Sequence, residues 1–223
     1  NLSFTIFNKY DQKLFNFLQK KIKLKKTLFI CSGSRIIFKK NIIDKFPNGI
    51  INWHNGRLPM DRGGAGITFS ILREERIFAQ SIHILSSKID EGKIIKQYFS
   101  LYPKSVIIPS DMMQYSFEQT RKNYYDFITK LRKKFKFELI KQPEHLSRYN
   151  PRIYTEDDGW IDWNLDSRDL INFINAFDDP YAGASTYLNN GNFGKLYLKN
   201  VQLQGGDTSN HPFMSGIVSR HDG

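Results

Sequence analysis

Two polar side chains at the end of a short apolar run are the first candidates for chemistry. Asn52 and His54 follow Ile50 and Ile51, and residues two apart on a strand point to the same face of a sheet. A carboxamide can donate a hydrogen bond to a carbonyl oxygen as it becomes an oxyanion, and an imidazole can move a proton near neutral pH. The pair therefore suits acyl transfer, although a single histidine at a strand end can also have a structural role.

Acyl transfer usually requires a third group that orients the imidazole, and Asp90 is the candidate. It lies between two predicted strands and shortly before Gly92, which permits a tight turn. We expect the Asn52 amide, the His54 imidazole and the Asp90 carboxylate to lie within contact distance, beside a hollow that admits a ligand.

The order and spacing of these residues resemble the signature of a known family. The matching segments are Asn52-Trp53-His54, Leu58-Pro59, Arg62-Gly63 and Asp90-x-Gly92, with Asp90 placed 36 residues after His54. Together they resemble the signature of the formyltransferases that use N10-formyltetrahydrofolate. Residues 28–37 are similar to the strand and loop whose main chain contacts the pterin ring. Residues 159–163, 176–177 and 180–184 resemble the start of the C-terminal domain shared by methionyl-tRNA formyltransferases and nucleotide-sugar N-formyltransferases.

The resemblance implies a reaction and a role for each residue. A primary amine would attack the formyl carbon of N10-formyltetrahydrofolate, the cosubstrate. Asn52 would stabilise the oxyanion, His54 would carry a proton from the amine to the departing folate nitrogen, and Asp90 would hold the His54 ring. Three further residues would bind the folate together with Asp90, chiefly through main-chain groups: Arg35, Ile36 and Ile37.

Three side chains are candidates for binding the second substrate: Arg57, Arg62 and His83. For Arg57, a phosphate or carboxylate contact and a surface salt bridge both remain open. His83 precedes Asp90 by seven residues, as in several formyltransferases that act on sugar or ribonucleotide amines, whereas the tRNA enzymes tend to carry an apolar residue there. The resemblance favours a nucleotide-linked amino sugar, as in the synthesis of lipopolysaccharide O-antigen. The alternatives are a methionyl-tRNA formyltransferase and a non-catalytic folate- or nucleotide-binding remnant.

Periodicity places these residues on the elements of an α/β fold. We predict strands at residues 28–31, from 50, at 77–85 and at 94–101, and helices at 9–24, 41–46, 67–75 and from Ser110. Residues 77–85 alternate as in a half-buried strand. The buried stripe of the first helix would be Leu14, Phe17, Leu18 and Ile22. In the last helix we expect the aromatic residues in the core, because the following side chains recur at helical spacing: Phe117, Tyr124, Ile128, Leu131 and Phe135.

The resemblance implies two domains, both partial. Residues 1–150 would form a Rossmann-like formyltransferase sheet with flanking helices, lacking its N-terminal part, and residues 151–223 a small β-rich, barrel-like domain that breaks off early. Residues 142–152 carry two prolines without periodicity and predict a linker. Beyond it we predict a strand from Trp160 to Trp163, a helix capped by Asp166-Ser167, and strands at 184–188 and 195–203 joined by Asn189-Asn190-Gly191-Asn192.

Composition narrows the class of protein. No apolar run in the 223 residues approaches the roughly 20 that span a bilayer, and no signal peptide is recognisable, so we expect a cytoplasmic protein without a membrane partner. One cysteine excludes an internal disulfide and a cysteine-based zinc site, and the five histidines lack metal-ligand spacing. The net charge of +11 fits solvated lysine-rich helices as well as phosphorylated partners. We expect no nucleic acid partner unless tRNA is the substrate, and the resemblance is compatible with a homodimer.

Overall fold

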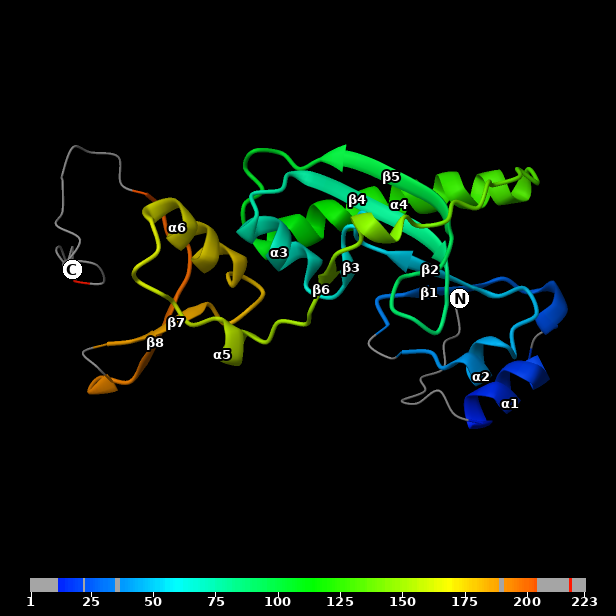
Figure 1. The fold of residues 1–223 in the computed structure, drawn as a ribbon, viewed down its shortest axis with the longest axis horizontal. Coiled ribbons are helices and arrows are strands. Elements are labelled where there is room, and N and C mark those ends of the chain that lie inside the picture. Colours follow the sequence, from blue (N-terminus) through cyan, green and yellow to red (C-terminus); the bar gives the residue numbers. More distant parts are fainter. Residues whose placement is uncertain (1–11, 22, 35–36, 189–190, 204–216, 218–223) are drawn as a thin grey trace. The chain divides into compact units, whose positions relative to one another are not determined.

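The computed structural model describes residues 12–21, 23–34, 37–188, 191–203 and 217 (Figure 1). The chain divides into two compact units, each made of three stretches that are separated in the sequence. Unit 1 comprises Asn1–Gly63, Ala79–Phe99 and Phe127–Tyr149, and unit 2 comprises Gly64–Phe78, Ser100–Asp126 and Asn150–Gly223. Asn52, His54 and Asp90 therefore all belong to unit 1.

A mixed four-stranded sheet with flanking helices is the framework of this α/β fold. Its strands are β1 (Phe29–Ser32), β2 (Ile50–His54), β4 (Ile77–Ile84) and β5 (Ile94–Leu101), in the spatial order β1-β2-β4-β5 (Figure 1). β2 runs parallel to β1 and antiparallel to β4, and the register places Asn52 between Cys31 and His83. The four predicted strands are thus confirmed, with ends that differ by one residue at most.

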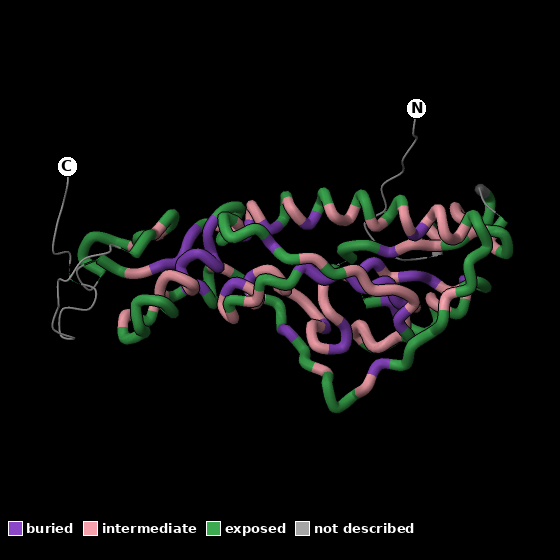
Figure 2. The backbone as a smooth tube through the Cα atoms, turned by 90° about the horizontal axis from the view of Figure 1, so that it is seen from above, coloured by how far each residue is buried: buried purple, intermediate pink, exposed green. Residues whose placement is uncertain are grey.

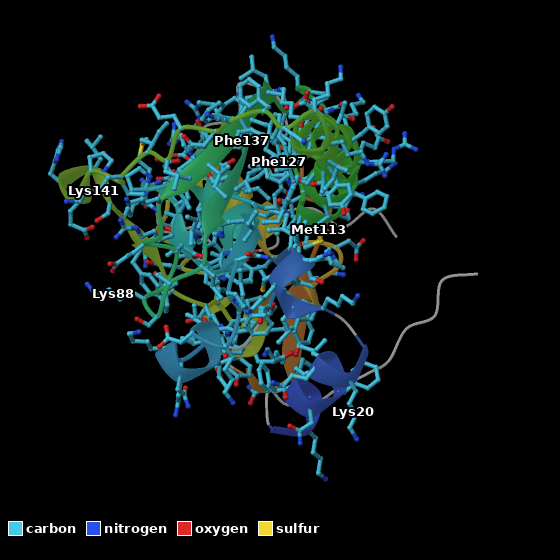
Figure 3. The ribbon with its side chains drawn as sticks, turned by 90° about the vertical axis from the view of Figure 1, so that its right-hand side faces the viewer. Lys20, Lys88, Met113, Phe127, Phe137 and Lys141 are labelled. Atoms are coloured by element: carbon cyan, nitrogen blue, oxygen red, sulfur yellow. The ribbon has the colours of Figure 1, made fainter. Side chains whose placement is uncertain are left out.

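Alternate residues of β2 face opposite sides of the sheet. Ile51 and Trp53 are buried in one hydrophobic core with Ile82 and Phe127. The rings of Trp53 and Phe127 meet edge to face with centroids 5.6 Å apart, and Phe137 packs against Phe127 at 5.1 Å (Figure 3). This anchored face leaves Asn52 and His54 on the other side of the strand.

Three short helices accompany β1 and β2 in unit 1. They are α1 (Gln12–Lys21), η1 (Leu24–Lys26) and α2 (Lys40–Ile43). Leu14, Phe17 and Leu18 are half-buried as the helical stripe predicts, while residues 9–11 and Ile22 of the predicted helix lie outside the described residues. Leu18 packs on a small core made of Cys31, Phe38, Phe46 and Ile50.

The long predicted helix is α4 (Pro109–Arg132). Ile128 and Leu131 of its predicted stripe pack against the core, but the aromatic members of the stripe do not. The buried residues of α4 are Pro109, Met112, Ser116 and Phe127. Phe117 is 75% exposed, Tyr124 is 47% exposed and Phe135, beyond the helix end, is 56% exposed. The prediction that these aromatic residues lie in the core is wrong, because aromatic side chains occur on more than one face of the helix and spacing alone does not select the buried one.

β4 is also more buried than its sequence suggests. Residues 78–83 are all buried, without the alternation predicted for a half-buried strand (Figure 2). Continuous burial is expected of a strand that is covered on both faces. The prediction of a half-buried strand at residues 77–85 is therefore wrong. Gln80, Ser81 and His83 are the polar side chains that this burial encloses.

Unit 2 has a separate hydrophobic core. It includes α3 (Gly66–Leu72), α5 (Thr155–Asp158), α6 (Ser167–Ala176) and the hairpin of β7 (Ala184–Tyr187) and β8 (Lys195–Leu198). The buried members of the core are Ile71, Phe78, Tyr102, Met112, Ile174, Ala176, Phe177 and Ala184. This core combines residues that precede position 150 with residues that follow it. The predicted domain boundary at 150–151 therefore stays a prediction.

Several predictions for the C-terminal part can be compared with the structure. Asp166 caps α6, since its carboxylate accepts the backbone N–H groups of Arg168 and Asp169, each at 2.9 Å. The strand predicted at Trp160 to Trp163 is wrong: Trp160 forms an isolated bridge with Ser185. The hairpin strands are confirmed, although β8 ends at Leu198. Asn189 and Asn190 of the predicted turn lie outside the described residues, as do 204–216 and 218–223.

The remaining elements are short. β3 (Arg62–Gly63) pairs with β6 (Tyr149–Asn150), and η2 (Glu144–Leu146) precedes β6. Among the described residues, every helix is too short or too polar to cross a membrane.

Candidate active site

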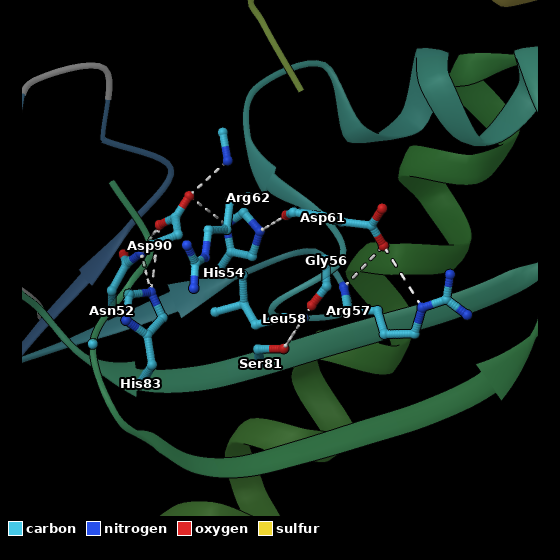
Figure 4. A network of polar contacts seen from close by, with 12 residues as sticks. Asn52, His54, Gly56, Arg57, Leu58, Asp61, Arg62, Ser81, His83 and Asp90 are labelled. Atoms are coloured by element: carbon cyan, nitrogen blue, oxygen red, sulfur yellow. Dashed lines mark hydrogen bonds and ion pairs between the residues drawn. The ribbon is translucent and has the colours of Figure 1, made fainter. Parts of the chain in front are cut away.

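The end of β2 and the loop that follows it are fixed by buried polar groups of unit 1. Ser81 on β4 donates its hydroxyl hydrogen to the Gly56 carbonyl at 2.6 Å and accepts the N–H of Leu58 at 3.2 Å. Gln97 on β5 donates to the Leu58 carbonyl at 3.0 Å. These contacts hold the loop directly after His54, so the His54 side chain leaves the strand from a fixed backbone (Figure 4).

Asp90 lies in the connection from β4 to β5 with a backbone φ of +54°, in the left-handed region. Two residues after Asp90 the turn has no space for a side chain, because a Cβ atom on Gly92 would lie 1.6 Å from the Ile84 carbonyl oxygen. The Asp90 carboxylate accepts the backbone N–H of Gly63 at 2.9 Å and an Asn52 amide N–H at 3.3 Å. Its Oδ2 lies 3.6 Å from Nδ1 of His54, and both side chains are 12% exposed.

The structure therefore brings Asn52, His54 and Asp90 together at the contact distances expected from the sequence (Figure 4). This contact places a carboxamide, an imidazole and a carboxylate within reach of one another.

The tautomer of His54 is set by the main chain. Nε2 lies 2.6 Å from the carbonyl oxygen of Asp61, and because a carbonyl only accepts, Nε2 carries a hydrogen. In the neutral ring the lone pair is then on Nδ1, which faces the Asp90 carboxylate. A proton taken up at Nδ1 would lie between the ring and that carboxylate. From the sequence we expected Asp90 alone to orient the His54 ring. In the structure the Asp61 carbonyl also orients the ring through Nε2.

Two arrangements of hydrogens fit the contact between Asn52 and His83. Nδ1 of His83 lies 3.0 Å from the Ile84 carbonyl and must donate to it. Nε2 lies 3.0 Å from Asn52 Nδ2 and 3.4 Å from Asp90 Oδ1. In the neutral ring Nε2 accepts an Asn52 N–H, and in the protonated ring it donates to Asp90, which frees the Asn52 amide from that contact.

The environment of Asp90 favours its ionised form. Burial by itself raises the pKa of the Asp90 carboxyl. The hydrogen bond with His83, the positive charge of His54 and the Gly63 N–H outweigh burial, so the pKa lies below its ordinary value. An anion is therefore present beside His54 at neutral pH, where it can stabilise an imidazolium.

Arg62, predicted to bind substrate, is buried and already bound on several sides. Its Nε donates to the Gln142 side-chain oxygen at 3.1 Å, and its two terminal nitrogens donate to the Glu144 carboxylate, each at 3.1 Å. The Gln142 amide in turn donates to the carbonyl oxygens of Asp90 and Gly92 at 2.6 and 2.7 Å. Gln142 was predicted to begin a linker, and that prediction is wrong because the residue is 6% exposed and bound within unit 1.

The other predicted site residues lie as follows. Arg57 Nε lies 3.9 Å from the Asp61 carboxylate, and its backbone N–H donates to the same group at 3.3 Å. His83 is 1% exposed and lies against Asp90. Ile37 is 58% exposed, and Arg35 and Ile36 lie outside the described residues. A cavity of about 390 Å³ adjoins the Arg62 side chain, lined by Arg62, Glu91, Lys93, Lys141, Gln142, Pro143 and Glu144.

Two residues of the site were not identified from the sequence. Asp61 acts through its main-chain carbonyl, which has no sequence signature. Gln142 was assigned to the predicted linker at 142–152, and no feature of the surrounding sequence indicated a role in the site.

Comparison with known proteins shows similarity to formyltransferases in sequence and in fold. Residues 153–223 match the formyl transferase C-terminal domain. The chain is 28% identical over 177 residues to the bifunctional polymyxin resistance protein ArnA of Wigglesworthia glossinidia brevipalpis, which covers 74% of this chain and 25% of that protein. It is 28% identical over 188 residues to the methionyl-tRNA formyltransferase of Protochlamydia amoebophila, covering 79% of this chain and 54% of the relative.

The fold also matches a solved structure, the N-formyltransferase from Helicobacter canadensis in complex with folinic acid and dTDP-3-aminofucose. The TM-score is 0.60 at 24% identity, over 72% of this chain and 58% of that one. The two proteins share a fold, and in this chain an Asn-His-Asp cluster lies at the end of a strand of the mixed α/β sheet. The chain is thus similar to formyltransferases in its C-terminal part and over much of its sequence. It spans between a quarter and about half of the length of the two curated relatives.

Proposed function

We propose that this chain carries the formyl-transfer site of an N-formyltransferase that uses N10-formyltetrahydrofolate. The observation that carries the proposal is the Asp90 carboxylate, which lies 3.3 Å from the Asn52 amide nitrogen and 3.6 Å from the His54 ring. An oxyanion donor, a proton carrier and an anion that stabilises the protonated carrier thus share one site. The folinic acid in the Helicobacter canadensis structure supports a folate as the formyl donor.

In the proposed reaction a primary amine attacks the formyl carbon and the formyl oxygen becomes an oxyanion. Asn52 donates an N–H to that oxygen, and the N–H available is the one that now contacts Asp90 at the longer distance of 3.3 Å. His54 takes a proton from the attacking amine and returns it to N10 of the folate as the carbon–nitrogen bond breaks. The imidazolium formed in between lies beside the Asp90 carboxylate and donates from Nε2 to the Asp61 carbonyl.

For the acceptor we favour an amino sugar carried on a nucleotide, because the charge of the chain is unevenly distributed. Residues 1–150 contain 28 Lys and Arg against 12 Asp and Glu, a formal charge of +16, whereas residues 151–223 contain 5 against 10, a formal charge of −5. A tRNA would require basic groups along an extended surface, and an acidic C-terminal part repels its phosphates. A nucleotide sugar has two phosphates and needs one local site. The dTDP-3-aminofucose of the Helicobacter canadensis protein supports this class of acceptor.

Two alternatives are retained. A methionyl-tRNA formyltransferase is supported by the relative from Protochlamydia amoebophila. A folate- or nucleotide-binding protein without formyl transfer is the second, because the chain covers only part of its relatives.

The test is a formyl-transfer assay with N10-formyltetrahydrofolate and three acceptors: dTDP-3-aminofucose, other nucleotide-linked amino sugars and methionyl-tRNA. We expect a formylated sugar, detected by mass spectrometry, and binding of the sugar nucleotide that changes little with salt. A steep loss of acceptor binding with salt, together with formylated methionyl-tRNA, would identify the tRNA enzyme. Folate binding without any formylated product would support the non-catalytic alternative.

A further inference from the structure

Asp90 depends on contacts from outside its own turn, because its backbone lies in a conformation that a residue with a side chain rarely adopts. The backbone φ of Asp90 is +54°. Gly92 packs so closely against the Ile84 carbonyl that a residue with a side chain does not fit at position 92. The direction of the carboxylate toward His54 follows from this backbone, so whatever holds the backbone also sets the catalytic geometry.

One buried side chain closes this turn. The Gln142 amide nitrogen donates to the carbonyl of Asp90 at 2.6 Å and to the carbonyl of Gly92 at 2.7 Å. Its side-chain oxygen accepts from Arg62 Nε at 3.1 Å. A reversed amide would place its oxygen against two carbonyl oxygens and its nitrogen against a guanidinium N–H, so the amide has a single favourable orientation.

Two residues that are adjacent in the sequence, Arg62 and Gly63, fix the main chain and the carboxylate of Asp90. Arg62 orients Gln142, which binds the Asp90 main chain, and Gly63 donates its backbone N–H to the Asp90 carboxylate at 2.9 Å. Arg62 is itself fixed by the fork to Glu144 and by its backbone N–H, which donates to the Arg148 carbonyl at 3.1 Å.

We propose that Gln142 is a positioning residue for formyl transfer, which holds the Asp90 turn so that the carboxylate faces His54. This inference rests on the proposed function for its catalytic meaning, but the positioning itself can be measured without turnover. A merely structural glutamine would affect stability and leave the ionisation of Asp90 unchanged.

The experiment replaces Gln142 in the full chain by Met, which has a similar length and no hydrogen-bond donor. Asn48→Leu is the matched control, because the Asn48 amide likewise donates to two carbonyls two residues apart, those of Lys25 and Thr27, each at 3.1 Å. Carbon-13 NMR of the aspartate carboxyl groups, with Asp90→Asn for assignment, follows the titration of Asp90. Melting temperatures are recorded in parallel.

We expect Gln142→Met to raise the titration midpoint of Asp90 by about one pH unit, a tenfold change in its protonation equilibrium. The carboxylate would then lose part of its contact with the Gly63 N–H and the imidazoles. Asn48→Leu should leave the midpoint unchanged. Where formyl transfer is detected, Gln142→Met should lower kcat by roughly 10- to 100-fold with a smaller change in KM, since misplacement of a catalytic group acts on the reaction step.

An unchanged Asp90 midpoint in a folded Gln142→Met protein would overturn the inference. If that variant does not fold, Glu144→Ala provides the test, because the Glu144 side chain is 72% exposed and its loss releases Arg62 without opening the interior. A smaller upward shift of the Asp90 midpoint is expected there, and no shift would again overturn the inference. Absence of formyl transfer in the unmodified chain would count against the proposed function alone.

Discussion

Oδ1 of Asp90 lies 3.4 Å from Nε2 of His83. The opposite carboxylate oxygen faces His54, so Asp90 is placed between two imidazole rings. His83 was expected to contact substrate, but in this arrangement it is fully buried and acts on the charge of Asp90 and on the Asn52 amide. The carboxylate is thus stabilised as an anion from two sides.

The first prediction concerns Asn52. Asn52→Ala should lower kcat for formyl transfer by about 100- to 1000-fold, because one oxyanion donor is lost. Steady-state kinetics in a version of the protein that is active provides the measurement. Asn48→Ala removes an amide of the same type from the surface and should leave kcat within about twofold. A comparable decrease in both variants would contradict the assignment of Asn52.

The second prediction concerns pH. The pKa of Asp90 is lowered in the folded protein, so its ionised form stabilises the fold. This contribution is complete above the unfolded pKa of about 4 and is lost as pH falls through the lower folded pKa. Urea unfolding at several pH values should therefore show a stability difference between the wild type and Asp90→Asn that is largest near neutral pH and shrinks below about pH 4. A difference independent of pH would refute the lowered pKa.

The third prediction concerns Gly92. Gly92→Ala should destabilise the fold by more than about 2 kcal/mol, because the added Cβ would lie 1.6 Å from the backbone oxygen of Ile84 and the turn must move. Gly33→Ala is the control. Gly33 also has a positive φ, of +61°, but nothing lies within 4 Å of an added Cβ, so only the left-handed backbone cost of about 1 kcal/mol is expected. Equal losses in urea unfolding would show that the close approach at Gly92 is absent.

The fourth prediction compares two phenylalanines of α4. Phe127 is fully buried against Trp53, and Phe127→Ala should cost about 3–5 kcal/mol. Phe117 is 75% exposed, and Phe117→Ala should change stability by less than about 0.5 kcal/mol. Chemical denaturation of both variants distinguishes this from the sequence-based expectation, in which Phe117 would be the costly position.

The sequence predicts the contact among Asn52, His54 and Asp90 because the geometry of this contact follows from local rules. Asn52 and His54 share a face through the alternation of a strand, and Asp90 reaches them because Gly92 permits the turn between β4 and β5. The contribution of Asp61 could not be predicted, because a main-chain carbonyl gives no residue-type signal. Gln142 was missed for another reason: its partners are backbone carbonyls about 50 positions away, which no local pattern reveals.

The buried face of α4 shows the corresponding limit for the fold. Helical spacing correctly indicates a long helix, but Phe117 and Phe127 both belong to apolar stripes, and only the surroundings of the folded chain decide which is covered. The prediction of a strand from Trp160 to Trp163 is wrong, because only Trp160 pairs, through a single bridge to Ser185.

Residues 142–148, which lie in the segment predicted as a linker, are bound to other parts of unit 1. Gln142 binds the Asp90 turn, Glu144 binds Arg62, and Arg148 donates to the Asp61 carboxylate at 2.8 Å and to the Pro59 carbonyl at 3.2 Å. Dissection of the protein into separately expressed pieces should respect these ties. A truncation that stops short of residue 142 would delete the clamp on Asp90 along with the downstream region, and any loss of activity would then be wrongly credited to the missing domain.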